Sequence, residues 1–345
     1  MMRRLAIVST VAVVALLLAG CSGSTATSQR PPSSGTAGTS EPPDGPISSL
    51  PPTTANTTTT TSVPLPKPSL YTPGAGEPEP QVKAAAARFL EIVTTYDPGG
   101  GTPEATAARL VGAGLRPDPS SEVVALLDGG AEAVGEIVYP QLGGLTGSQA
   151  SVMTVIRQTF RSSEGQISTV TRSVDVRLDK VNDAWTVTSV ASDGGGPPSS
   201  PSSPSSPALT PLARQVLGSP RLSMSDSSRW DVAAGRIDDR VLQLVSTLTE
   251  TNALSITVFA TGHPANVFGA TSVSNHTEGR GVDVWAVDGQ PIVDASPEST
   301  AHAVIVAALE LGATEVGSPW DLDGPGGPSF ANALHADHLH LAFDA

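Results

Sequence analysis

The sequence predicts an α+β protein with two small folded domains. Between residues 81 and 192, apolar side chains recur at helical spacing and then give way to long β-rich runs. A second series of helices and strands fills residues 208–345. Stretches rich in serine and proline occupy residues 21–80 and 193–207. Because such stretches bury little apolar surface, the domain boundaries fall within them.

The N-terminus has the pattern of a secretory signal. Arg3 and Arg4 precede an apolar run that ends at Leu18. This run is shorter than a membrane span, which needs roughly 20 apolar residues. The ending Leu-Ala-Gly-Cys resembles a bacterial lipobox, with an ordinary signal peptide as the alternative. The resemblance implies that residues 1–20 are removed and that a lipid on Cys21 anchors the chain to the outer face of the cytoplasmic membrane.

Composition argues against internal disulfide bonds and against nucleic-acid partners. Cys21 is the only cysteine, so we expect no internal disulfide in this exported chain. Removal of residues 1–20 takes away two of the 19 basic side chains and leaves 33 acidic ones, a net charge of −16. Such an acidic chain is a poor partner for nucleic acids or polyphosphates. We therefore expect no nucleic-acid partner.

Residues 21–80 are predicted to form a disordered tether. The segment consists largely of Ser, Thr, Pro and Gly, with unbroken threonine at 57–61. It has too few apolar side chains to offset the chain entropy lost on folding. A flexible coil of about 60 residues has an end-to-end distance of roughly 40–45 Å. Such a tether would hold the domains off a membrane, although an unselected linker would have the same composition.

Residues 81–192 are predicted to form a small α+β domain. Apolar residues at 82–96 recur at helical spacing. Thr102 and Pro103 have the residue types of a helix N-cap and first helical position, and a further helix is predicted from Ser121 to Leu127. The β-rich runs lie at 133–139, 151–160, 166–178 and 184–190.

Helices followed by a curved antiparallel sheet, with Trp185 on its last strand, resemble the cystatin-like or nuclear-transport-factor-like fold. Exported bacterial lipoproteins commonly carry such a domain. This one contains no histidine or cysteine and no carboxylate pair at an obvious catalytic spacing. The sequence therefore favours a spacer or a protein-interaction module over an enzyme, and the partner of this domain is unknown.

Residues 208–345 alternate helices and strands. Ser296 and Pro297 are typical of the start of a helix, and Gly312 is typical of its end. The predicted elements are a helix at 238–249, strands at 254–259 and 282–287, a helix that begins at 296, and a last strand at 338–343.

Histidine is confined to this last domain. All six histidines lie between His263 and His340, so any imidazole chemistry belongs there. Because side chains alternate across a strand, His338 and His340 should project from one face while Leu339 and Leu341 face the core. Two imidazoles are thereby brought within reach of one point.

A second polar cluster precedes the strand at 282–287. His276 lies in the loop and Asp283 follows seven residues later, with glycines between them that permit a sharp turn. Zinc binds nitrogen and oxygen donors in a tetrahedron, and catalytic sites keep three protein ligands and a water. His276, Asp283 and His340 supply that count. The sequence therefore predicts a Zn²⁺ site.

These motifs carry a family resemblance. Ser-x-His-x-x-Gly-x-Gly-x-Asp from Ser274 to Asp283, followed by His-x-His at 338–340, resembles the zinc D,D-peptidases and the wider superfamily of lysostaphin, D-Ala-D-Ala carboxypeptidase and sonic hedgehog. With His335 added, the spacing is similar to the murein endopeptidase branch. The resemblance covers about residues 210–345 and implies a hedgehog/D,D-peptidase-like fold.

The resemblance also implies a role for each residue. His276, Asp283 and His340 would be the metal ligands, and His338 a catalytic histidine that accepts and returns a proton. His335 would steady the oxyanion or orient the base. The implied activity is zinc-dependent hydrolysis of peptide bonds in peptidoglycan.

Two features depart from the family pattern. Family members often end the first strand in Ser-Gly-Tyr-Arg, whose arginine serves substrate recognition, whereas this chain has Thr-Gly-His-Pro at 261–264. Arg280 or Arg240 could substitute, and His263 could bind substrate or serve the turn. A glutamate base near the last ligands is also absent, which leaves Asp337 and the histidines.

Three function classes stay open at this point. The first is the lipid-anchored zinc hydrolase, with endopeptidase and carboxypeptidase activity both open. The second is a non-catalytic envelope binding module that keeps the metal-site fold. The third is a structural lipoprotein whose first domain is the functional part. Trp285 and His302 are interpreted as ordinary structural residues.

Overall fold

The computed structural model describes residues 63–127, 131–195 and 209–345, all within one compact unit, Thr60–Ala345. The expected signal at 1–20, Cys21 and the expected tether up to residue 62 lie outside the described residues, as does the linker from 196 to 207. No helix in the described part of the chain is long and apolar enough to cross a membrane.

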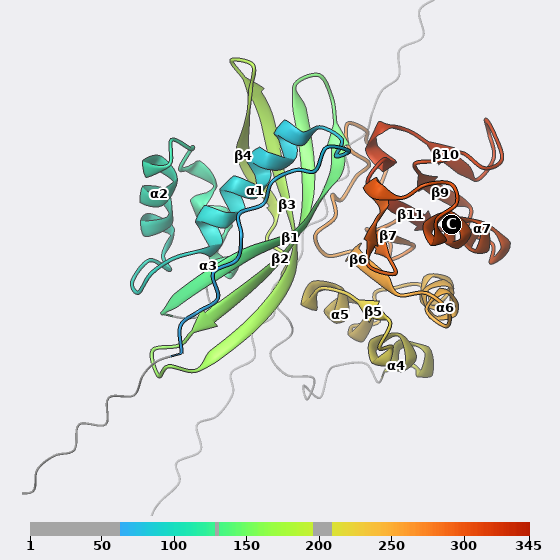
Figure 1. Ribbon diagram of the computed structural model, residues 1–345, viewed down its shortest axis with the longest axis horizontal. Helices are drawn as coiled ribbons and strands as arrows, with labels where there is room; N and C mark the ends of the chain where they lie inside the picture. Colours follow the sequence, from blue (N-terminus) through green and yellow to red (C-terminus); the bar gives the residue numbers. More distant parts are fainter. Residues whose placement is uncertain (1–62, 128–130, 196–208) are drawn as a thin grey trace, which may run out of the picture. The chain divides into compact units, whose positions relative to one another are not determined.

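The first domain, residues 80–192, has the predicted order of helices and then strands (Figure 1). Its four strands form one antiparallel sheet in the order β1-β2-β3-β4. Thr102 caps α2 as predicted, because its side chain accepts a hydrogen bond from the Ala105 amide. The elements are α1 (Pro80–Thr94), α2 (Pro103–Gly112), η1 (Asp118–Glu122), α3 (Val124–Leu127), β1 (Glu132–Leu145), β2 (Gln149–Arg161), β3 (Ile167–Val181) and β4 (Ala184–Ser192).

The core of the first domain lies where α1 crosses one face of this sheet (Figure 1). Val82, Phe89 and Val93, which recur at helical spacing, are at most 1% exposed and pack with sheet residues such as Leu142 and Val174. Burial of apolar side chains of this size stabilises the fold by about 1.5–3 kcal/mol each.

Two sequence expectations for this domain need correction. The helix expected from Ser121 to Leu127 is divided, because Val123 leaves the helical region at φ −110° and ψ 20° while its side chain is fully buried. The segment 63–79, assigned to the tether, packs on the domain. Tyr71 contacts the core and donates its amide hydrogen to Glu91 Oε1 at 2.7 Å. A Pro-rich stretch that composition alone assigns to disorder is thus held on the domain by Tyr71 and by the pairing of Glu77 with Lys83.

The second domain, residues 211–342, contains a sheet in the order β10-β9-β11-β7-β6-β5 with β8 paired to β7. Its apolar core includes Leu339 and Leu341, as the strand alternation predicts. The elements are α4 (Pro211–Gly218), β5 (Leu222–Ser223), α5 (Asp226–Ala233), α6 (Asp239–Leu248), β6 (Leu254–Val258), β7 (Gly281–Val287), β8 (Gln290–Pro291), η2 (Ile292–Asp294), α7 (Thr300–Glu310), β9 (Glu315–Ser318), β10 (Ser329–Ala331), η3 (Ala333–His335) and β11 (Leu339–Ala342).

The helix expected from Ser296 begins later. α7 starts at Thr300 with Ser299 as its N-cap residue, and Ser296 instead forms a turn in which its carbonyl accepts from the Ser299 amide. Ser296 Oγ hydrogen-bonds to Glu298 rather than to a helix amide. The cap-like residue types therefore stabilise the turn before the helix.

Strand pairing positions the polar residues of the second domain. β11 lies between β7 and β9 and is antiparallel to both. In this register His340 stands opposite Asp283 on one side and opposite Gly317 on the other. Directly paired residues in neighbouring strands have Cβ atoms about 4.5–5.5 Å apart. The pairing therefore brings together two predicted ligands separated by 57 residues in the chain.

Candidate metal centre

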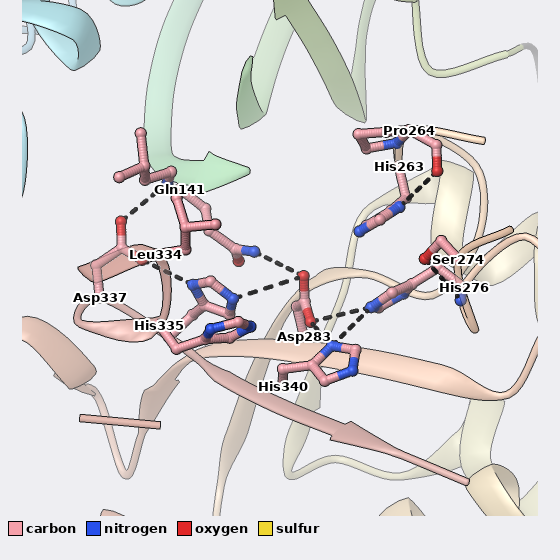
Figure 2. A network of polar contacts seen from close by, with 12 residues as sticks. Gln141, His263, Pro264, Ser274, His276, Asp283, Leu334, His335, Asp337 and His340 are labelled. Carbon is pink, nitrogen blue, oxygen red and sulfur yellow. Dashed lines mark hydrogen bonds and ion pairs between the residues drawn. The ribbon is translucent and has the colours of Figure 1, made fainter. Parts of the chain in front are cut away.

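Three side-chain atoms converge at the start of β7 (Figure 2). His276 Nε2 lies 3.1 Å from Asp283 Oδ1 and 3.1 Å from His340 Nδ1, and the last two atoms are 3.0 Å apart. All three residues are buried. The three predicted ligands are thus brought together in nearly an equilateral triangle.

Hydrogen bonding fixes which atoms of this triangle carry lone pairs. His276 Nδ1 lies 2.6 Å from the Phe259 carbonyl oxygen, which can only accept, so Nδ1 carries the proton. In the neutral ring, Nε2 then presents a lone pair to a carboxylate oxygen. Acceptor atoms that converge in a buried site repel one another unless a proton or a metal ion lies between them. A tetrahedral zinc ion with bonds of about 2.0–2.1 Å requires ligand atoms roughly 3.3 Å apart, close to the observed spacing.

The charge balance of the site also fits a cation. Burial opposes a charge on His340, but hydrogen bonds with Asp283 and Glu315 outweigh it and raise the pKa of His340 to about 9. Burial likewise opposes ionisation of Asp283, yet the neighbouring His276 and His338 hold its pKa well below the usual range. In the metal-free protein a proton on His340 therefore relieves the repulsion that a metal ion would relieve.

His263 belongs to the same cluster. The ligand atoms of His263, His276 and Asp283 all lie within 4.8 Å of one another, so this group too could hold a metal ion. However, the His263 ring stacks on His276, with centroids 4.0 Å apart and planes 10° from parallel. Ring lone pairs lie in the ring plane, so those of two parallel stacked imidazoles do not meet at one point. His340 therefore completes the site better than His263.

His338 is oriented by the residue before it. Its Nδ1 lies 2.7 Å from Asp337 Oδ1, and because a carboxylate only accepts, Nδ1 carries the proton. Nε2 is then free to accept a proton and lies 4.0 Å from Asp283 Oδ2. Burial alone would raise the pKa of Asp337, but Lys83 and the hydrogen bond from His338 lower it. Asp337 therefore stays ionised and fixes the tautomer of His338.

His335 lies beside these residues, with its ring centroid 5.0 Å from that of His338. Its Nδ1 is 2.8 Å from Asn332 Oδ1, an oxygen that also accepts from two backbone amides. Nδ1 therefore carries the proton and Nε2 a lone pair. Burial and the neighbouring histidines lower the pKa of His335 to about 2. A neutral ring in this tautomer cannot donate to an oxyanion, so His335 fits an orienting role only.

The arginines lie away from the centre. Arg280 hydrogen-bonds to Asn275 Oδ1 and pairs with Glu278. Arg240 binds both oxygens of Asp238 and the carbonyl of Asp344. Neither lines the cavity above the metal centre, so the structure gives them local structural contacts rather than a position for binding substrate.

A cavity of about 360 Å³ opens onto the centre. Asp283, His338 and His340 line it, and Glu315 contributes a further carboxylate. Part of its wall comes from the first domain, through Leu142, Gly143 and Met153. No arginine or lysine is among the described residues that line it.

Sequence reasoning missed the contribution of the first domain. Gln141 donates from Nε2 to Asp283 Oδ2 at 2.6 Å, and Leu142 donates its amide hydrogen to Asp337 Oδ2 at 2.9 Å (Figure 2). Trp285, interpreted as an ordinary structural residue, stacks on Tyr139 of the first domain with ring centroids 4.8 Å apart. No local spacing connects residues so distant in the chain, so no motif could have indicated these contacts.

No protein-family model and no curated protein matches this chain. Among solved structures, a putative calcium/calmodulin-dependent protein kinase II association domain from Xanthomonas campestris is 17% identical, with a TM-score of 0.21, over 30% of this chain and 76% of that one. A nuclear transport factor 2-like superfamily protein from Salmonella enterica is 15% identical, with a TM-score of 0.18, over 21% and 56%.

The association domain of C. elegans calcium/calmodulin-dependent protein kinase II is 17% identical, with a TM-score of 0.17, over 20% of this chain and 56% of that one. These likenesses cover at most 30% of this chain at TM-scores of 0.21 or lower, and no conclusion about this chain follows from them.

Proposed function

We propose that the chain is a lipid-anchored, zinc-dependent hydrolase of peptide bonds in peptidoglycan. The observation that carries the proposal is the convergence of His276 Nε2, Asp283 Oδ1 and His340 Nδ1 within 3.1 Å of one another. Two neutral imidazoles and one carboxylate are a donor set that zinc uses in catalytic sites, with a further position left for water. The resemblance of the two motifs to zinc D,D-peptidases supplies the reaction class.

Zinc in this triangle would lower the pKa of a water to about 7 and polarise the scissile carbonyl. The chain supplies the proton transfers. His338 Nε2 accepts the proton that the attacking water loses, and the resulting imidazolium returns it to the nitrogen of the leaving amine. Asp337 holds the Nδ1 proton and stabilises the charged ring between these steps.

The lining of the cavity favours an internal peptide bond over a chain end. A carboxypeptidase must bind a terminal carboxylate, usually with a cation. Three carboxylates, Asp283, Glu315 and Asp344, line this cavity, and no arginine or lysine among the described residues does. We therefore propose endopeptidase activity, with an amine-bearing peptide as the favoured substrate. The acidic lining repels a free carboxylate and attracts an ammonium group.

Defined muropeptides test the proposal. The chain without residues 1–20 is dialysed against zinc, its metal content is measured, and it is incubated with cross-linked and uncross-linked muropeptides. We expect about one zinc per chain and release of peptides from the cross-linked substrate only, with no release after chelation. A zinc-loaded chain that cleaves neither substrate would favour the non-catalytic binding module instead.

The anchor is a separate part of the proposal. Cys21 follows Leu-Ala-Gly and would carry the lipid. We expect Cys21→Ala to remove radiolabelled fatty acid from the protein and to shift it from the membrane to the soluble fraction. Unchanged labelling would contradict the anchor without affecting the metal site.

A further inference from the structure

One face of β1 in the first domain contacts one face of β7 at the metal centre. Asp283 and Trp285 project from the same face of β7, and Tyr139 and Gln141 from the same face of β1. The Tyr139 ring stacks on Trp285 at 4.8 Å and 11°, and Gln141 Nε2 donates to Asp283 Oδ2 at 2.6 Å. Two neighbouring residues on one face of β1 therefore each contact one of two neighbouring residues on one face of β7.

The side chain of Gln141 is buried at this contact. It is 0% exposed, and within the described residues its Oε1 has no hydrogen-bond partner. A buried amide with an unsatisfied oxygen is destabilising. Among the described residues, the side-chain amide of Gln141 makes no hydrogen bond within the first domain. Its bond to Asp283 also occupies Oδ2, which leaves Oδ1 as the oxygen directed at His276 and His340.

A second contact reaches the proposed base. Asp337 Oδ1 accepts from His338, while Oδ2 accepts from the Leu142 amide and lies 2.5 Å from Lys83 Nζ. Lys83 on α1 is fully buried and also pairs with Glu77. Removal of one member of a buried ion pair is destabilising, because the other charge stays buried without its partner. Lys83 and the Leu142 amide thus hold the carboxylate that orients His338.

The two domains pack closely at two glycines away from the metal centre. A Cβ added at Gly144 would lie 2.1 Å from the Phe268 ring, and one at Gly262 would lie 2.4 Å from the Ser173 carbonyl oxygen. Gly262 also has φ +102°, where glycine is strongly favoured. The contact is therefore close-packed away from the metal centre as well.

We propose that the first domain completes the metal site and is not a spacer: Gln141 is a positioning residue for the ligand Asp283, and Lys83 is a positioning residue for His338 through Asp337. This inference rests on the proposed zinc site. Neither residue touches substrate or metal. The two domains form one catalytic unit, and the substrate cavity has walls from both.

Zinc affinity tests the role of Gln141. Gln141→Met keeps the length of the side chain and removes the hydrogen bond to Asp283. Loss of a residue that orients a metal ligand typically costs 10–100-fold in metal affinity. We expect that loss in competition with a chelator, together with a changed visible absorption spectrum when Co²⁺ replaces zinc. Both are readouts of metal geometry that do not depend on hydrolysis.

Asp226→Ala is the matched control. Asp226 Oδ2 accepts from both the amide and hydroxyl of Thr171, so this variant weakens contact between the same two domains away from the metal ligands. We expect its zinc affinity to stay within about twofold of the unmodified chain. An equal loss in both variants would assign the effect to domain contact in general and overturn the specific role of Gln141.

Lys83→Met tests the second contact. We expect zinc affinity close to that of the unmodified chain and a fall in kcat of about 10-fold or more with KM little changed, because the base loses its orientation while the ligands remain. Unchanged zinc affinity in Gln141→Met together with unchanged kcat in Lys83→Met would overturn the inference and leave the proposed function standing. No zinc binding by the unmodified chain would overturn both. If the unmodified chain binds zinc but cleaves nothing, the zinc affinity of Gln141→Met alone tests the inference. A loss of affinity would support it and an unchanged affinity would overturn it.

Discussion

His276 Nε2 and His340 Nδ1 face each other across 3.1 Å, although 64 residues separate them in the chain. The Phe259 carbonyl fixes the proton of His276 on the opposite side of its ring. Each nitrogen also lies within 3.1 Å of Asp283 Oδ1. With His340 unprotonated, the three atoms of this buried triangle are all acceptors, which is the arrangement that suits a shared cation.

Ligand removal should therefore separate the two candidate triads. We expect His340→Ala to reduce zinc affinity by more than about 100-fold, the upper range for loss of an outer-shell partner. His263→Ala should retain most of the affinity, because the His263 ring is stacked parallel to His276. Metal content after dialysis measures both. The reverse order of effects would make His263 the third ligand.

His338→Ala should separate metal binding from proton transfer. His338 donates to Asp337 and is not part of the ligand triangle, so zinc content should stay at the level of the unmodified chain. Loss of a general acid–base group typically lowers the rate by 10²–10⁴-fold. Peptide release from defined muropeptides measures this fall. A variant that keeps full activity would exclude His338 as the base.

The sequence predicted the parts of this site that local patterns encode. Strand alternation placed His338 and His340 on one face, and the core positions of Leu339 and Leu341 are confirmed. The α+β fold class is confirmed as well, with one sheet in each domain. All of these depend on a residue's neighbours in the chain.

The remainder depends on tertiary contact. Gln141 and Lys83 reach the centre only because two domains dock, and nothing in the composition of the first domain indicates a catalytic role. Trp285, interpreted as an ordinary structural residue, packs on Tyr139 of the other domain, a partner that its own strand does not indicate. The start of α7 was predicted too early, because the hydroxyl of a serine such as Ser296 can either cap a helix or stabilise a turn.

Gly317 should be sensitive to the smallest substitution. An added Cβ would lie 2.5 Å from the His335 ring, so Gly317→Ala must displace that ring. Overpacking of this kind typically costs 1–3 kcal/mol. We expect a lower melting temperature and reduced hydrolysis. Gly147→Ala, where nothing lies within 4 Å of the added Cβ, is the control and should leave both unchanged.

Asp337 should contribute to stability at neutral pH and lose that contribution in acid. Its folded pKa is lower than its unfolded pKa, since Lys83 and His338 outweigh the effect of burial. The unfolded chain therefore binds more protons near pH 4, and the stabilisation disappears as pH falls below the usual aspartate range.

Asp337→Asn tests this pH dependence. We expect the variant to be less stable at pH 7 by about 1.5–3 kcal/mol, the value of a hydrogen bond to a charged group. Its free energy of unfolding should also fall less steeply between about pH 5 and pH 3 than that of the unmodified chain. Denaturant unfolding across this range measures both, and parallel pH profiles would contradict the assignment.

The central claim is that His276, Asp283 and His340 hold one metal ion. Anomalous diffraction at the zinc edge, from crystals of the chain grown with zinc, tests it most directly. We predict a single strong peak at about 2.0–2.2 Å from His276 Nε2, Asp283 Oδ1 and His340 Nδ1. A map without a peak in this triangle, or with a peak bound to His263 in place of His340, would contradict the account.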